Sequence, residues 1–179
     1  MQKTFDVKRM VLASMMVALC VVLPIAFHAV PNGGTTFLPM HIPILLCGML
    51  CGWHYGVICG LLGPLLSCLL TGMPAMAILP AMMVECAVYG LVTGLTLRFV
   101  RTGKLYIDLY IALILAMLLG RVMSGVAKAW IFSMGLTMKG WVTASFVTAL
   151  PGIVIQLALV PLLVAMLMKL RFLPTRYNK

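Results

Sequence analysis

The chain has 179 residues, 64% of them hydrophobic and 9% charged, and a mean hydropathy of +1.17. No soluble domain of this length needs so much apolar surface, so the composition predicts an integral membrane protein. The formal net charge of +10 does not indicate a nucleic-acid partner, because most basic residues flank apolar runs, as they do in cytoplasmic loops beside membrane spans. The basic residues that flank apolar runs are Lys3, Lys8, Arg9, Arg98, Arg101, Lys104, Lys169, Arg171, Arg176 and Lys179. Asp108 is expected to be a surface partner of the basic loop 98–104.

The apolar runs predict an all-α fold of six transmembrane helices with both termini in the cytoplasm, in which residues 1–179 form a single membrane domain. The first run, residues 10–29, resembles a secretory signal, but it is long and no small-residue cleavage site ends it, so it is expected to remain as the first span. The second span is expected to be short and to begin near His41, between two prolines that suit a helix start. A cytoplasmic turn is expected at 52–56, and the third span is expected to end near residue 70. The last three spans are expected to cover 77–100, 105–134 and 141–170.

Six crossings place three turns on the outer face, at residues 30–40, 71–76 and 135–141. The polar residues inside the spans lie beneath these turns, so the fold is expected to be a cup that opens outward. Asn32 lies in the first turn, and His41 lies at the helix start beside it. His41 is a candidate ligand contact, with helix capping or loop packing as the alternative.

Small residues predict close helix contact at two places. Ser14 and Ala18 form a small-xxx-small pair in the first span, which suits either internal packing or a docking face for a partner protein. Glycines repeat at every fourth position in the next two spans, where they favour tight packing. They are Gly48, Gly52, Gly56 and Gly60.

Glu85 is the one acidic residue inside an apolar run. Helical rise places it roughly 12 Å below the outer end of its span, and Lys128 roughly 9 Å below the outer end of the next one, so the two side chains can meet at one level. Tyr89 lies one turn from Glu85 on the same face. Two alternatives remain open for Glu85 and Lys128: a purely structural ion pair, or a pair that also faces a polar ligand.

Residues 105–134 form an apolar span with two cations in its interior, Arg121 and Lys128. A charge at the bilayer centre costs at least about 2.5 to 3.5 kcal/mol, so both side chains must face protein or water. Seven residues at 100° each bring them to nearly one face, about 10 Å apart along the axis. This stripe is the predicted working site. Gln156 in the last span is equally compatible with packing and with a role in the site.

No cofactor and no metal site are expected. The cysteines all lie in apolar runs and lack the C-x-x-C spacing of zinc and redox sites, so they are interpreted as small buried thiols. The histidines, at positions 28, 41 and 54, fall on two sides of the membrane in this topology, so the chain is not predicted to be an enzyme. The cysteines are Cys20, Cys47, Cys51, Cys59, Cys68 and Cys86.

Several stretches together resemble one family of membrane proteins. They are Phe37-Leu-Pro-Met-His-Ile-Pro-Ile44, Leu70-Thr-Gly-Met-Pro74, Gly120-Arg-Val-Met-Ser-Gly125 and Ala127-Lys-Ala129. With the six-span size and the small pair in the first span, they resemble the substrate-binding S components of energy-coupling factor (ECF) transporters over nearly the whole chain.

The resemblance implies a high-affinity subunit of the bacterial cell membrane that captures a vitamin or related micronutrient from outside. It implies docking, through Ser14 and Ala18, on a transmembrane coupling subunit that carries two ATPase subunits. The chain itself has no glycine loop with Lys-Ser/Thr for ATP, so the energy must come from those partners. The cargo contacts that it implies are Asn32, His41, Glu85, Arg121 and Lys128, to which the polar Gln156 is added.

The charged side chains restrict the chemistry of such a cargo. Arg121 offers a planar fork for a carboxylate or phosphate, whereas Glu85 favours an amine or hydroxyl donor. A B6-type vitamin, a pyrimidine precursor or a pantothenate-like molecule fits both.

Other classes of protein remain as alternatives. A stand-alone secondary transporter, coupled to protons through Glu85, would move its substrate without ATPases. A membrane enzyme would need a catalytic set at one depth. An assembly protein without cargo would be indifferent to every vitamin.

Overall fold

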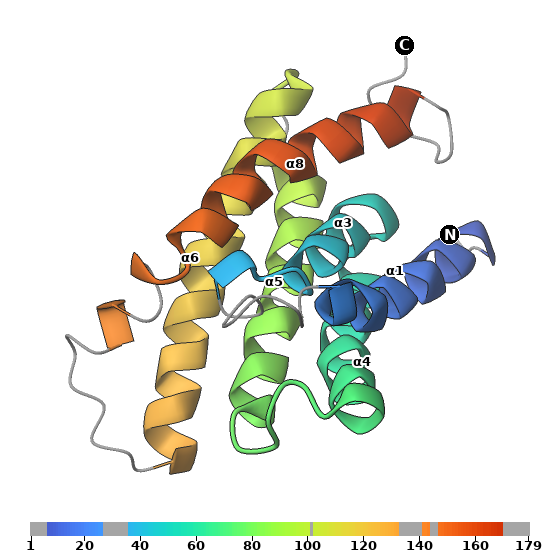
Figure 1. The fold of residues 1–179 in the computed structure, drawn as a ribbon. Coiled ribbons are helices and arrows are strands. Elements are labelled where there is room, and N and C mark those ends of the chain that lie inside the picture. The colour runs from blue at the N-terminus through green and yellow to red at the C-terminus, as the bar shows by residue number, and fades with distance from the viewer. Residues whose placement is uncertain (1–6, 27–35, 101, 133–140, 144–146, 170–179) are drawn as a thin grey trace.

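The computed structural model describes residues 7–26, 36–100, 102–132, 141–143 and 147–169 (Figure 1). The regular structure of these residues is helical, as the sequence predicts. Five of the helices are long and apolar enough to cross a membrane, and α3 is shorter. The helices are α1 (Val7–Ala26), α3 (His41–Cys51), α4 (Trp53–Thr71), α5 (Leu79–Phe99), α6 (Leu105–Phe132) and α8 (Leu150–Lys169).

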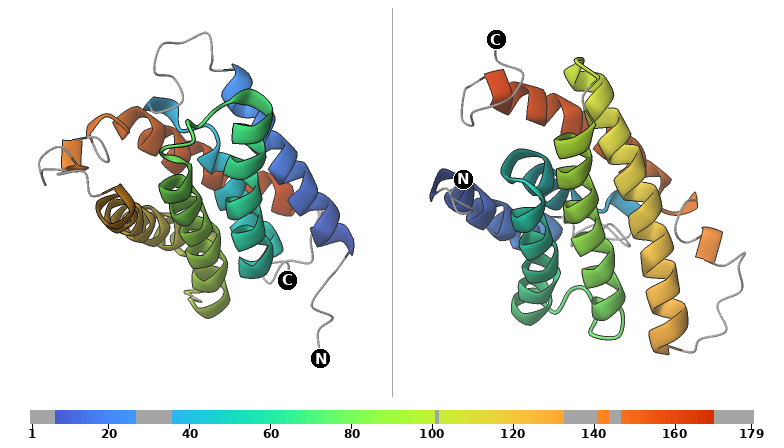
Figure 2. Two further views of the ribbon diagram at one scale, coloured as in Figure 1. Left: turned by 90° about the horizontal axis from the view of Figure 1, so that it is seen from below. Right: turned by 180° about the vertical axis from the view of Figure 1, so that it is seen from behind.

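Three long helices, α4, α5 and α6, run side by side, and α1 packs on α4 (Figures 1 and 2). The loop between α4 and α5 and the C-terminal end of α6 lie at the bottom of Figure 1, whereas the α5–α6 connection lies at the top. Helix α8 crosses this layer and packs on α3 and α6. Large apolar side chains are exposed on α1, α6 and α8, which suits contact with lipid hydrocarbon.

The short helix α3 lies at the centre of the bundle. It packs against α1, α4, α5 and α8, and most of its residues are buried. Its 11 residues span about 16 Å, roughly half of the hydrocarbon core, so α3 is too short to cross a bilayer alone. The predicted start at His41 is confirmed, but the helix lengths do not establish a sixth crossing.

Glycines allow α3, α4 and α5 to approach backbone to backbone. A methyl group added at Gly90 would meet the backbone of Gly56, and one at Gly60 would meet the backbone of Cys86. Gly48 of α3 faces Gly90 and Thr93 in the same way. The close contact expected at the repeated glycines is therefore confirmed at positions 48, 56 and 60, and it holds α5 in the place from which its polar residues face α3.

Replacing Gly90 with alanine is expected to lower the thermal stability of the purified protein. Alanine favours a helix by about 1 kcal/mol over glycine, but an extra methyl in a close-packed contact costs about 1 to 3 kcal/mol, and here it would meet backbone that cannot turn away. Thermal unfolding in detergent measures the effect. Ala158→Val, which adds bulk to an exposed position on α8, is the control. An unchanged or higher Tm for Gly90→Ala would contradict the tight contact.

Two predicted boundaries were wrong. The turn expected at 52–56 is Gly52 alone, whose φ of 98° reverses the chain so that Trp53 already begins α4. The last long helix begins at Leu150 and not at residue 141, with Pro151 in its first turn, where a missing N–H costs nothing. The sequence shows where the prolines and glycines are, but it does not show which of them begins or ends a helix.

The expectation of a surface position for Asp108 was also wrong. Asp108 is fully buried, and its Oδ1 accepts hydrogen bonds from the Thr102 hydroxyl at 2.6 Å and the Thr102 N–H at 3.1 Å. Gly103, with a φ of 83°, turns the connection back so that Thr102 reaches the first turn of α6. The carboxylate therefore fastens the α5–α6 connection.

Candidate functional site

A buried contact between His41 and Glu85 joins the start of α3 to α5. The Nε2 atom of His41 lies 3.8 Å from Oε1 of Glu85, and the side chains are 2% and 13% exposed. Glu85 is six residues after the start of α5, about 9 Å along the helix, so its contact with His41 lies well inside the bundle from the N-terminal end of α5. The separation is too long for a hydrogen bond, and neither ring nitrogen of His41 forms one with the described residues. The imidazole therefore has hydrogen-bonding capacity left for a ligand.

Tyr89 holds the carboxylate in place. Its hydroxyl donates a 2.8 Å hydrogen bond to Oε1 of Glu85, and its ring centroid lies 5.2 Å from that of His41, tilted by 58°. On α6, Gly120 packs so closely on the Tyr89 ring that a methyl group would not fit. Tyr89 thereby connects α3, α5 and α6.

Both cations of α6 lie within electrostatic range of His41. Arg121 follows Gly120 and is only 4% exposed. The charges of Arg121 and Lys128 both act on His41, and that of Arg121 also acts on Tyr89. Among the described side chains, however, no ion pair within 4 Å joins Glu85 to Lys128. Glu85 instead faces His41 and Tyr89, because the short α3 inserts its histidine beside α5.

Gln156 approaches the cluster from α8. Its Nε2 donates to the carbonyl oxygen of Leu38 at 3.4 Å, and the backbone N–H of His41 donates to the same oxygen at 3.1 Å. One turn earlier, Gly152 lies against the backbone of Thr36 and Phe37. Gln156 is fully buried, and its Oε1 has no hydrogen-bond partner among the described residues. Helix α8 thus fixes the segment that carries His41, and Gln156 keeps one acceptor free.

Two residues of the cluster were not predicted as site residues. Tyr89 was interpreted only as a neighbour of Glu85, and Ser124 only as a small residue beside the face of Arg121 and Lys128. Ser124 is 3% exposed, and its hydroxyl finds no partner in the described part of the chain. Its position three residues after Arg121 is the signal that places it on the same helix face. Asn32 lies outside the described residues.

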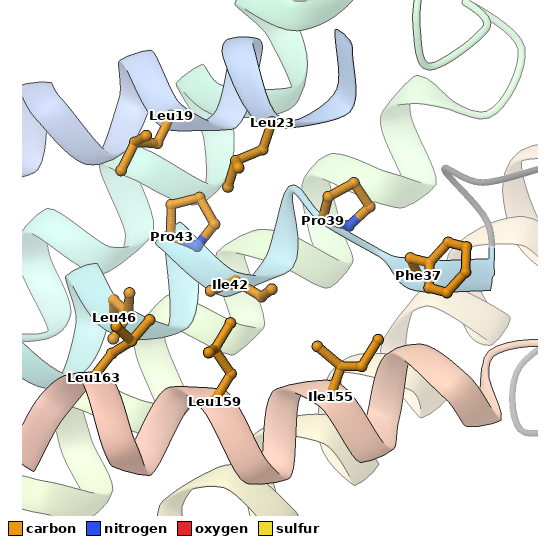
Figure 3. A pocket seen from close by; sticks show the side chains of 10 residues that line it. All are labelled: Leu19, Leu23, Phe37, Pro39, Ile42, Pro43, Leu46, Ile155, Leu159 and Leu163. Atoms are coloured by element: carbon orange, nitrogen blue, oxygen red, sulfur yellow. The ribbon is translucent and has the colours of Figure 1, made fainter. Parts of the chain in front are cut away.

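An apolar groove of about 330 Å³ lies beside the cluster, between α1, α3 and α8 (Figure 3). The segment 36–43 separates the two: Phe37, Pro39 and Ile42 point into the groove, while the Leu38 carbonyl and His41 belong to the polar side. A wholly apolar lining cannot orient a polar ligand. The groove is lined by Leu19, Leu23, Phe37, Pro39, Ile42, Pro43, Leu46, Ile155, Leu159 and Leu163.

The sequence model of a protein family described as "ECF transporter, substrate-specific component" matches residues 8–164, nearly the whole chain. The chain belongs to this family. No curated protein and no solved structure matched it. The resemblance noted in the sequence is thereby confirmed. Proteins of this family are membrane-embedded S components, substrate-binding subunits of a transporter rather than enzymes, and they pair with an ECF module in the membrane.

The S component has an uncovered surface on α1. Ser14 and Ala18 are both exposed, and the Ser14 hydroxyl donates to the Met10 carbonyl of its own helix at 2.9 Å. Large apolar side chains surround them, so the described part of the protein does not cover this face. The residues are Met10, Val11, Met15, Leu19, Val22 and Ile25. Within the described residues, the small pair is therefore not used for internal packing, one of the two alternatives.

The cysteines of the S component are buried and form no disulfide, which confirms their interpretation as buried thiols. Several of them lie where α1, α3, α4 and α5 meet, and Cys20 packs against Gly63. Among the described residues, no group of three or more metal-ligating side chains has a geometry that could hold a metal ion.

Replacing Tyr89 with phenylalanine is expected to weaken cargo binding by the S component about 10- to 150-fold while leaving its fold intact. The ring that packs on Gly120 remains, but the carboxylate loses a hydrogen bond, and such bonds to charged groups contribute about 1.5 to 3 kcal/mol. Titration calorimetry measures the change, with the small molecule that mass spectrometry identifies after its release from the purified protein. Unaltered affinity would show that Tyr89 does not position Glu85 for binding.

Proposed function

We propose that this chain is the high-affinity vitamin-binding subunit of an ECF-type ABC transporter in a bacterial cell membrane. It captures a vitamin or related micronutrient from outside and passes it inward in a complex that hydrolyses ATP. Membership of the family supports the general role. The observation that carries the proposal for the site is the buried meeting of His41 and Glu85, with open hydrogen-bonding atoms around it.

The cargo site is proposed to consist of His41, Glu85, Arg121, Lys128 and Gln156, with Asn32 from the preceding segment. Buried polar groups without partners cost roughly 1 to 3 kcal/mol each, and a protein retains such groups where a ligand satisfies them. His41 and Gln156 both keep such atoms in the described structure. A small polar molecule with donor and acceptor groups would form hydrogen bonds with these atoms, whether it is B6-type, a pyrimidine precursor or pantothenate-like.

The partners are proposed to be a transmembrane coupling subunit and two ATPases. In a bilayer, small residues on an uncovered helix face let another helix approach closely, and Ser14 and Ala18 have that position on α1. The basic loop 98–104 favours a cytoplasmic side for the α5–α6 connection. We infer a single membrane domain, 1–179, with both termini in the cytoplasm and a central α3 that crosses together with its flanking segments.

Uptake into proteoliposomes tests the transport role. The subunit is reconstituted alone and with coupling subunit and ATPases, and radiolabelled vitamins are followed with and without internal ATP. Binding by the subunit alone and accumulation only with partners and ATP is the expected result. Accumulation by the subunit alone, driven by a pH gradient and lost in Glu85→Gln, would establish the secondary transporter instead.

A further inference from the structure

The buried hydroxyl of Ser124 on α6 differs from other hydroxyls of the long helices. Ser14, Thr71 and Thr93 each donate to the carbonyl oxygen four residues earlier in their own helix, at 2.9, 2.7 and 2.7 Å. This bond satisfies a hydroxyl in an apolar helix that water does not reach. Ser124 is 3% exposed, and its hydroxyl has no hydrogen-bond partner in the described part of the chain. A buried hydroxyl that is left unpaired costs free energy, so it indicates a ligand that pairs with it.

Helix geometry places Ser124 level with Glu85. Helices α5 and α6 are antiparallel neighbours, because the chain turns back at their short connection (Figure 1). Gly120 of α6 packs on the ring of Tyr89 of α5, which gives the two helices a common reference level. Glu85 is four residues before Tyr89, and Ser124 is four residues after Gly120. Both therefore lie one helical turn, about 6 Å, from that level in the same direction.

Ser124 also lies on the side of α6 that faces α5. It follows Gly120 by four residues, so the two positions share a helix face, and this face packs on α5. At the level of Ser124, the imidazole of His41 lies 3.8 Å from the carboxylate of Glu85. The Ser124 hydroxyl forms a hydrogen bond with neither of these two groups. A ligand group between α6 and this pair would satisfy the hydroxyl and the carboxylate together.

An alcohol hydroxyl is the ligand group that matches this arrangement. The carboxylate of Glu85 only accepts hydrogen bonds, whereas the hydroxyl of Ser124 has a proton to donate. An alcohol can donate to Glu85 and accept from Ser124 at the same time. A protonated amine only donates, so it would leave the proton of Ser124 unpaired.

We propose that Ser124 binds the cargo and that the cargo is a vitamin or micronutrient with an alcohol hydroxyl, which lies between Ser124 and Glu85. This rests on the proposed function. It adds a residue of α6 to the proposed site and restricts the chemical class of the cargo.

A panel of ligands tests the hydroxyl. Purified protein in detergent is titrated with pyridoxine, hydroxymethyl-aminopyrimidine, pantothenate, thiamine and riboflavin, which have an alcohol hydroxyl, and with nicotinate and biotin, which have none. The vitamin that binds is then compared with analogues in which one hydroxyl is replaced by hydrogen. One vitamin with an alcohol hydroxyl is expected to bind, and the loss of one particular hydroxyl is expected to weaken its binding.

Ser124→Ala is expected to weaken binding of that vitamin about 5- to 150-fold, the equivalent of the about 1 to 3 kcal/mol that an unsatisfied buried group costs. Binding of the deoxy analogue is expected to change by less than about twofold, because the group that pairs with Ser124 is already missing from it. The two effects are thus expected not to add, as for groups in direct contact.

Ser67→Ala is the matched control. Ser67 is also a buried serine of a long helix, but its hydroxyl donates to the carbonyl oxygen of Met73 at 2.8 Å. The control is expected to lower the Tm of the ligand-free protein by a few degrees and to leave the Kd unchanged. Ser124→Ala is expected to leave this Tm unchanged or higher, because it removes an unpaired hydroxyl. A lower Tm with an unchanged Kd for Ser124→Ala would show a structural role only and overturn the proposal.

The other outcomes separate this contact from the general role. Equal weakening of the vitamin and its deoxy analogue by Ser124→Ala would overturn the hydroxyl contact and leave the vitamin-binding role in place. Binding of nicotinate or biotin alone would do the same. Absence of binding by every molecule of the panel would overturn both the contact and the role.

Discussion

Purified Arg121→Gln protein is expected to bind its cargo roughly 30- to 4,000-fold more weakly than the original protein. This range corresponds to the about 2 to 5 kcal/mol lost when one partner of a buried, hydrogen-bonded charge pair is removed. Arg121 is buried beside Gly120, at the depth where Tyr89 packs on α6. Glutamine keeps most of the length of the side chain, so the loss reports the charge and the fork rather than a cavity.

Titration calorimetry measures this affinity, with the small molecule that mass spectrometry identifies after its release from the purified protein. Arg98→Gln makes the same replacement at an exposed arginine near the end of α5, and it is expected to bind as the original protein does. Circular dichroism and thermal unfolding confirm that both variants are folded. Equal affinities for Arg121→Gln and Arg98→Gln would remove Arg121 from the site.

Replacing Glu85 with glutamine is expected to weaken binding by roughly 10- to 150-fold, the equivalent of the about 1.5 to 3 kcal/mol that a hydrogen bond to a charged group contributes. The amide oxygen can still accept the hydrogen bond from Tyr89, so the local fold remains. The change removes the negative charge of the carboxylate beside His41, and it replaces a group that only accepts hydrogen bonds by an amide that also donates them.

Asp108→Asn is the matched control for Glu85→Gln. It also replaces a buried carboxylate by its amide, but at the α5–α6 connection, where Asp108 accepts hydrogen bonds from Thr102. The control is expected to lower the Tm and to leave the Kd unchanged, whereas Glu85→Gln changes the Kd. If both variants lose affinity in proportion to their loss of stability, Glu85 has a structural role only.

Local patterns in the sequence were enough to predict much of this arrangement. Proline at 39 and 43 predicted a helix start at His41, and the spacing of Glu85 and Tyr89 predicted that they share a face of α5; both are observed. The cations of α6 could be assigned to the protein interior because hydrocarbon does not tolerate them. Each of these predictions depends only on the residues of one helix and on whether water or lipid surrounds that helix.

Contacts between helices could not be predicted in the same way. The depth of Glu85 and Lys128 made an ion pair conceivable, but depth along an axis does not say which way a neighbouring helix is turned. Because α3 is short and buried, His41 occupies the place beside Glu85 that Lys128 was expected to fill. Asp108 was misplaced for a related reason, since the turn at Gly103 that buries it has no periodic signal.

The molecules released from denatured protein test the central claim most directly, that the buried cluster around His41 and Glu85 holds the cargo. Protein purified from cells grown in rich medium is denatured, and released small molecules are quantified by mass spectrometry beside Arg121→Gln, Glu85→Gln and Arg98→Gln. One vitamin-like molecule per chain is expected from the original protein and from Arg98→Gln, and little from the other two. The same molecule in equal amount from all four proteins would place the cargo elsewhere and contradict the account.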